Sequence, residues 1–143
     1  MNDILQDLST SSLISAIEGN LFAILSDFRK LPRAEFHDEA EIMWSMTDIP
    51  FLLFNSIMRA QLQLERIEAV IQPIVAQAES RKVPLLWWTG PTTQPADLGI
   101  HLERQRFVSE GQMPGMAVDL AKLNENLPKP RGLTVQRVRT VKL

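Results

Sequence analysis

The fold is decided by residues 84–120, PLLWWTGPTTQPADLGIHLERQRFVSEGQMPGMAVDL, which combine a buried-strand pattern, a helix start and several distinctive short motifs. The apolar run from Val83 to Trp88 predicts a strand covered on both faces. Because strand side chains alternate, Trp87 and Trp88 should enter different layers. Pro95 suits the first turn of the next helix, where its missing N–H costs nothing. We therefore expect a strand, a loop and a helix, in that order.

Upstream, helical and extended patterns follow one another. Apolar residues at three-and-four spacing predict an amphipathic helix over residues 9–31, which packs against a sheet, and a second helix over 60–81. Residues 34–57 change to the two-residue period of an antiparallel meander. Within the meander, the apolar run 51–54 predicts a central strand. The pattern predicts an α/β (α+β) fold with a mixed, mostly antiparallel sheet and helices on both faces.

The chain is predicted to form one domain over residues 1–127. Pro128 and Pro130 then form a spacer, and Leu133, Val135 and Val138 predict a closing strand. A chain of 143 residues is long enough for one substantial core. Residues 128–143 are thus predicted to form a spacer and a closing strand.

Composition excludes several classes of function. A formal net charge of -2 gives no reason to expect nucleic acid as a partner. The absence of cysteine excludes disulfides and thiolate sites. The amino terminus lacks the pattern of a secretory signal, and the longest apolar run, 49–54, is too short to cross a bilayer. We expect a cytoplasmic protein with no membrane partner.

The chain contains no nucleophile elbow, Walker loop, dinucleotide-binding glycine motif or zinc-binding helix motif. The candidates for a small-molecule site are Trp44, Trp87 and Trp88, with Asn55 as its polar member. The alternative is that the tryptophans fill the core and that Asn55 caps a helix. No catalytic residue is predicted.

A metal site has one weak candidate. Glu35, His37, Glu39 and Glu41 would share a strand face if one strand ran through all of them. A single histidine with no second one nearby makes a poor ligand set, so a polar solvent face with a bend is the preferred interpretation and no metal is predicted.

Several motifs together resemble the amino-terminal half of two-domain GNAT-superfamily N-acetyltransferases. The likeness covers about two thirds of the chain and depends on the order and spacing of the motifs. The motifs are Thr47-Asp48-Ile49-Pro50, Phe54-Asn55, Pro84-Leu85-Leu86-Trp87-Trp88, Gly90-Pro91, Pro95-Ala96-Asp97-Leu98-Gly99, Leu102, Phe107, Gly115-Met116-Ala117, Asp119-Leu120, and Gly132-Leu133-Thr134-Val135 with Val138.

The resemblance implies a transferase that moves an acetyl group from acetyl-CoA to an amine. In that family a glycine-containing turn at a helix start holds the pyrophosphate. No pair of glycines in this chain reproduces that turn, so we expect this chain to bind no cofactor and to shape the cleft of a small-molecule amine acceptor. The catalytic domain would lie beyond Leu143, and a stop codon directly after Leu143 would count against this hypothesis.

The alternative is a free-standing, non-enzymatic GNAT-like module. Such a module would use its first helix and its sheet edge to hold a homodimer partner, or its tryptophans to bind a small ligand. One motif departs from the family pattern, because Arg106 stands where a glycine often precedes the phenylalanine that ends the helix. Without that glycine, we expect the helix to end by a geometry other than the left-handed one.

Overall fold

The computed structural model describes residues 4–124, 126–128 and 130–137. Its centre is a four-stranded sheet in the order β1-β2-β3-β4. The strands are β1 (Glu35–Asp38), β2 (Ile42–Met46), β3 (Ser56–Ala60) and β4 (Leu86–Trp87). The first three pair in antiparallel fashion, whereas β4 runs parallel to β3. The predicted meander and the mixed, mostly antiparallel sheet are confirmed.

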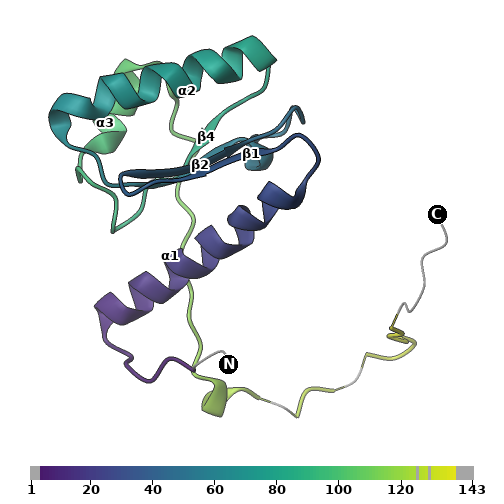
Figure 1. Cartoon of the computed structure of the whole chain (residues 1–143). Coiled ribbons are helices and arrows are strands. Elements are labelled where there is room, and N and C mark those ends of the chain that lie inside the picture. Colours follow the sequence, from purple (N-terminus) through teal and green to yellow (C-terminus); the bar gives the residue numbers. More distant parts are fainter. Residues whose placement is uncertain (1–3, 125, 129, 138–143) are drawn as a thin grey trace.

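Three helices cover the two faces of this sheet. They are α1 (Thr10–Ser26), α2 (Ile67–Arg81) and α3 (Leu98–Arg104). Figure 1 shows α1 on one face of the sheet and α2 with α3 on the other. This arrangement confirms the α/β class with helices on both faces. None of the helices in the described ranges combines the length and the apolar character needed to span a bilayer.

The first helix begins where the sequence predicts. The hydroxyl of Ser9 accepts a hydrogen bond from the backbone N–H of Ser12, at 3.4 Å, and so caps the helix. The helix runs unbroken through Gly19 and continues into a 3-10 turn over Asp27–Lys30. Leu25 is the single residue of α1 that is fully buried. The apolar stripe of α1 therefore lies on the sheet without being enclosed by it.

The core lies between the sheet and α2. Ile42, Trp44 and Met46 point to that side from β2 and are at most 7% exposed. They pack with Ile57 of β3 and with the buried face of α2. A second cluster joins α2 to α3; it consists of Ala60, Leu62, Ile67, Ile71, Leu98 and Leu102. Most of the enclosed apolar surface is thus on one side of the sheet, where it drives folding.

The prediction of a central strand at residues 51–54 is wrong. These residues form a loop with a 3-10 turn over Leu52–Phe54, and the strand begins only at Ser56. Phe51 is 54% exposed, and Phe54 packs on Phe28 with ring centroids 4.9 Å apart. A continuous apolar run is compatible with both a strand and a loop, and the side chain of Asn55 stabilises the loop here.

Two further predicted elements differ in extent. The helix predicted over 60–81 begins at Ile67, because residues 60–62 still pair with the sheet. The strand predicted from Val83 is shorter: β4 contains Leu86 and Trp87 and lies at the edge of the sheet, with its side chains half-buried. Pro84 removes one backbone donor just before it, which helps to explain the short pairing.

The end of α3 also differs from the prediction. Arg106 has a φ of 69°, so it adopts the left-handed conformation that glycine prefers. The N–H of Phe107 then reaches the carbonyl of Leu102, at 3.1 Å, as in a helix that ends on glycine. The prediction that arginine would force another geometry is therefore wrong.

The segment after α3 is extended and exposed. Residues 108–119 form no helix or strand, and a 3-10 turn follows at Leu120–Lys122. The predicted closing strand is not formed at Leu133 and Val135, which are both exposed; Val138 lies outside the described residues.

Candidate functional site

The four predicted site residues do not meet in one pocket. Trp44 lies in the core on the α2 side and stacks on His37, with ring centroids 4.1 Å apart. Trp87 packs against both apolar clusters and against Phe107. Trp88 follows β4 directly and its N–H still bonds to β3, so from the alternation of side chains we infer that it points to the α1 side. The structure thus separates Trp88 from the other two tryptophans.

Asn55 uses both of its amide groups inside the protein. Its Oδ1 accepts the N–H of Thr47 at 2.8 Å and lies 3.4 Å from the Thr47 hydroxyl. Its Nδ2 donates to the carbonyls of Ile49 and Phe51, at 2.8 and 3.1 Å. Asn55 is fully buried. These contacts make it the organiser of the loop between β2 and β3, a role that the sequence alternatives did not include.

The four candidate metal ligands are not brought together as a set, although Nδ1 of His37 and Oε1 of Glu39 are 3.8 Å apart. The carboxylate of Glu35 bonds to Gln77 and Arg81 of α2, whereas Glu41 pairs with Arg66 at 2.7 Å. The strand that carries His37 ends at Asp38, so the chain bends before Glu39. In the described part of the chain, no three histidine or carboxylate side chains are grouped so that they could hold a metal ion.

The α1 side of the sheet is more polar than the α2 side. Ser45 and Ser56 are paired on neighbouring strands, and both are 0% exposed. The hydroxyl of Ser56 donates to the carbonyl of Leu53, at 2.9 Å. The hydroxyl of Ser45 is buried without a partner among the described residues, and so is Nε of Arg59. This face therefore retains hydrogen-bonding capacity that the fold itself does not use.

One carboxylate of α1 reaches the same region. Oε1 of Glu18 accepts the N–H of Thr92 at 3.4 Å, in the loop that follows β4. Gly90 lies so close that a methyl group there would stand 2.1 Å from the same oxygen. The other oxygen, Oε2, is buried without a partner within the described ranges, as is Nε1 of Trp88. An unused acceptor on Glu18, which contacts the Gly90 loop, and an unused donor on Trp88, two residues before Gly90, thus remain.

The pairing of β2 with β3 contains a β-bulge. Trp44 pairs with Ile57 and Met43 with Arg59, so Met58 is the extra residue on β3. The N–H of Trp88 still bonds to the carbonyl of Ile57 at 2.9 Å, but the chain then leaves the sheet. It returns at Gln94, whose N–H bonds to the carbonyl of Ala60 at 3.0 Å. Residues 89–93 therefore form a loop between the end of β4 and the bridge that joins Gln94 to Gln61.

Neither the start of α2 nor the start of α3 suits a cofactor pyrophosphate. The turn before α2 contains no glycine, and Glu65 and Glu68 place negative charge there. A depression of about 220 Å³ lies beside this turn and includes both carboxylates together with His101 and Arg104. The loop before α3 carries Pro91 and Pro95, which lack the backbone donors that an anion needs. These residues do not fit the pyrophosphate of acetyl-CoA.

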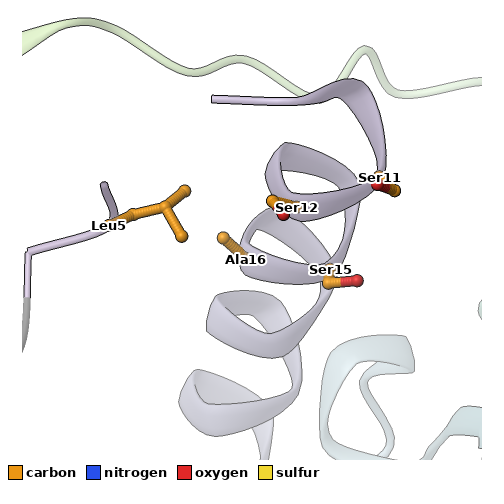
Figure 2. A pocket seen from close by; sticks show the side chains of 5 residues that line it. All are labelled: Leu5, Ser11, Ser12, Ser15 and Ala16. Atoms are coloured by element: carbon orange, nitrogen blue, oxygen red, sulfur yellow. The ribbon is translucent and has the colours of Figure 1, made fainter. Parts of the chain in front are cut away.

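A second hollow lies at the start of α1 (Figure 2). It measures about 440 Å³ and is lined by Leu5, Ser11, Ser12, Ser15 and Ala16. Figure 2 shows Leu5 facing the helix across this hollow. The lining carries no charged group, so it offers no basis for recognising an ionic substrate.

Comparison of the chain with protein-family models, with curated protein sequences and with solved structures gives no match. The fold and the residues around Glu18 and Trp88 are therefore the features from which a function is inferred. Glu18 was missed as a site residue from the sequence. A signal for it exists, because Glu18 is the single charged residue between Thr10 and Ser26.

Proposed function

We propose that this chain is a GNAT-like amino-terminal domain of an N-acetyltransferase, which does not itself catalyse the reaction but shapes the cleft for the amine acceptor. The observation that carries the proposal is the order of elements. A helix, three antiparallel strands, a helix, a fourth strand parallel to the third, and a last helix follow one another, an order that is compatible with a GNAT-like fold. The third strand, which pairs with this parallel fourth strand, also carries the bulge at Met58.

The chemistry around Glu18 supports an amine as the recognised group. Primary alkylamines are protonated near neutral pH, and a buried carboxylate oxygen without a partner attracts such a cation. The indole of Trp88 could add a cation–π contact from the sheet side. Transfer requires the neutral amine to attack the thioester of acetyl-CoA, with the oxyanion held by backbone N–H groups. That step belongs to the catalytic domain of the intact enzyme.

Calorimetry with acetyl-CoA tests where the cofactor binds. We expect no measurable heat with this chain alone, because Glu65 and Glu68 oppose a pyrophosphate at the start of α2. Binding in the micromolar range would overturn the assignment of the cofactor site to another domain. The same titration with the Glu65→Gln, Glu68→Gln double variant shows whether these two charges alone prevent binding.

A fluorescence titration with a panel of primary alkylamines tests the acceptor site. We expect quenching of tryptophan emission that is lost in Trp88→Phe, and an affinity that falls at least about tenfold in Glu18→Gln. Glu68→Gln is the matched control, because it removes an exposed carboxylate on another helix and should leave the affinity unchanged. Equal affinities in Glu18→Gln and the unmodified chain would show that Glu18 does not bind the amine.

A non-enzymatic interaction module is the second candidate, favoured by the incomplete cover of α1. Ile24 is 57% exposed, and the other apolar residues of α1 except Leu25 are at most half-buried. A partner could cover this helix. Sedimentation of Ile24→Glu tests this function, since the change would disrupt an interface through α1 and leave an amine site at Glu18 intact.

A further inference from the structure

The two edges of the sheet differ in how they are protected. The outer strand β1 carries Glu35, His37 and Asp38, and charged side chains discourage pairing with another strand. The opposite outer strand, β4, contains only Leu86 and Trp87 and has no charge. Backbone groups of a strand point alternately to either side, and the N–H groups of Leu86 and Trp88 bond inward to β3. The N–H of Trp87 therefore points to the open edge.

The same chain carries a segment with the pattern of a strand but with no strand partner. Met116, Val118 and Leu120 alternate with Ala117 and Asp119, as strand residues do. The three large side chains are 84%, 64% and 62% exposed. Residues 116–119 belong to no helix or strand. Exposed apolar residues in such a pattern form a segment suited to adding to a sheet edge.

This segment is directed away from the β4 edge of its own copy. Gly115 lies against Ile17 of α1. A Cβ atom added to Gly115 would stand 3.1 Å from Cγ2 of Ile17. Figure 1 shows the chain running from α3 past α1, so that the turn at Leu120–Lys122 lies beyond α1 on the side away from the sheet. Within one copy, the open edge and the strand-patterned segment are thus on opposite sides of a helix.

We propose that residues 116–120 of one copy add as a strand to the open edge of β4 in a second copy, and that the exchange is reciprocal. A twofold dimer satisfies both unpaired surfaces at once, because each copy offers one edge and one segment. The added strand would pair with the outward backbone groups of β4, including the N–H of Trp87, and would cover Met116, Val118 and Leu120. The inference does not depend on the proposed enzymatic function.

Sedimentation velocity over a concentration series tests the dimer. We expect reversible dimerisation, and Val118→Pro should raise the dissociation constant at least about tenfold, since proline cannot donate to a strand ladder. Thr134→Pro is the matched control, because Thr134 is an exposed β-branched residue in the same arm but outside the segment. A monomer at every concentration, or a dimer unaffected by Val118→Pro, would overturn the proposal.

Cross-linking distinguishes exchange between copies from pairing within one copy. The chain has no cysteine, so a cross-linker that reacts with thiols can join only the cysteines that are introduced. A mixture of Thr89→Cys and Val118→Cys should give a covalent heterodimer with a short bismaleimide, because Thr89 lies two residues after the end of β4 and is exposed. If the double variant instead gives only internally linked monomer at all concentrations, the segment pairs with its own sheet and the proposal is wrong.

Discussion

Asn55 is the residue on which the loop between β2 and β3 depends. Replacing it with alanine leaves the N–H of Thr47 and the carbonyls of Ile49 and Phe51 without their partner. Buried groups that lose a partner cost about 1–3 kcal/mol each, partly recovered by water in an exposed loop. We expect Asn55→Ala to lower the free energy of unfolding by about 2–4 kcal/mol in urea denaturation.

Asn20→Ala is the control for this change, because Asn20 is exposed on α1. It should alter the free energy of unfolding by no more than about 0.5 kcal/mol. Similar effects of the two substitutions would mean that the hydrogen bonds of Asn55 do not stabilise the fold.

Arg106 occupies a backbone conformation that disfavours every residue with a Cβ atom. Its φ of 69° costs about 1 kcal/mol relative to glycine. Arg106→Gly should therefore raise the free energy of unfolding by about 0.5–1 kcal/mol, as measured by thermal or urea denaturation. In contrast, Glu103→Gly inside α3 should lower it by about 1 kcal/mol. A destabilising Arg106→Gly would indicate that the arginine side chain makes a stabilising contact.

At the scale of the element, the start of α1 is sensitive to acid. Hydrogen bonds from the Ser12 hydroxyl, and then from the N–H and hydroxyl of Ser9, lower the pKa of Asp7 below its ordinary value of 3.8. Because the folded pKa is the lower one, this stabilisation is present above 3.8 and is lost as pH falls through the folded value. We expect the first turn of α1 to fray at that step.

Amide hydrogen exchange at Ser12, followed by NMR while the pH is lowered, measures this fraying. In Asp7→Asn the same amide should exchange faster already at neutral pH and show no acid-dependent step. The interpretation fails if the acid-dependent step persists in Asp7→Asn, since another group would then be responsible.

Periodicity predicted the elements that have a single apolar side and failed where a run was apolar throughout. Ile42, Trp44 and Met46 recur at every second position, and their strand was predicted correctly. The run 51–54 offers no period, so the sequence could not show that Asn55 would bind the preceding loop through four side-chain contacts. Residues 60–62 have helical spacing with the residues after them, but their backbone pairs with the sheet.

At the scale of the whole molecule, most of the packing energy lies on one side of the sheet. Ile71 of α2 is 0% exposed, whereas Ile14 of α1 is half-buried. Ile71→Ala should lower the free energy of unfolding by about 3 kcal/mol or more. Ile14→Ala should lower it by less than about 1.5 kcal/mol, because less apolar surface is lost and alanine favours the helix. Equal losses in urea denaturation would show that α1 is as tightly packed as α2.

The candidate site could be predicted only in part. Alternation predicts Trp87 and Trp88 in different layers, and Trp87 packs against the two apolar clusters, to which Trp88 does not belong. Residues that point to opposite faces of the sheet do not line one pocket. The sequence alone does not show which of the predicted site residues lie close together in the fold. Glu18 was identifiable as a lone carboxylate in an apolar helix, but its meeting with the loop at Gly90 depends on how α1 crosses the sheet.

The connection between β3 and β4 also has a kinetic consequence. β1, β2 and β3 are joined by the loops 39–41 and 47–55, whereas β4 joins β3 only after residues 61–85. Closing a longer loop costs more entropy, so we expect the meander to form first and β4 to dock late. The last unit to dock is commonly the first to open in native-state fluctuations. The Glu18 and Trp88 region would then be reached by transient release of β4, while the three-stranded meander stays folded.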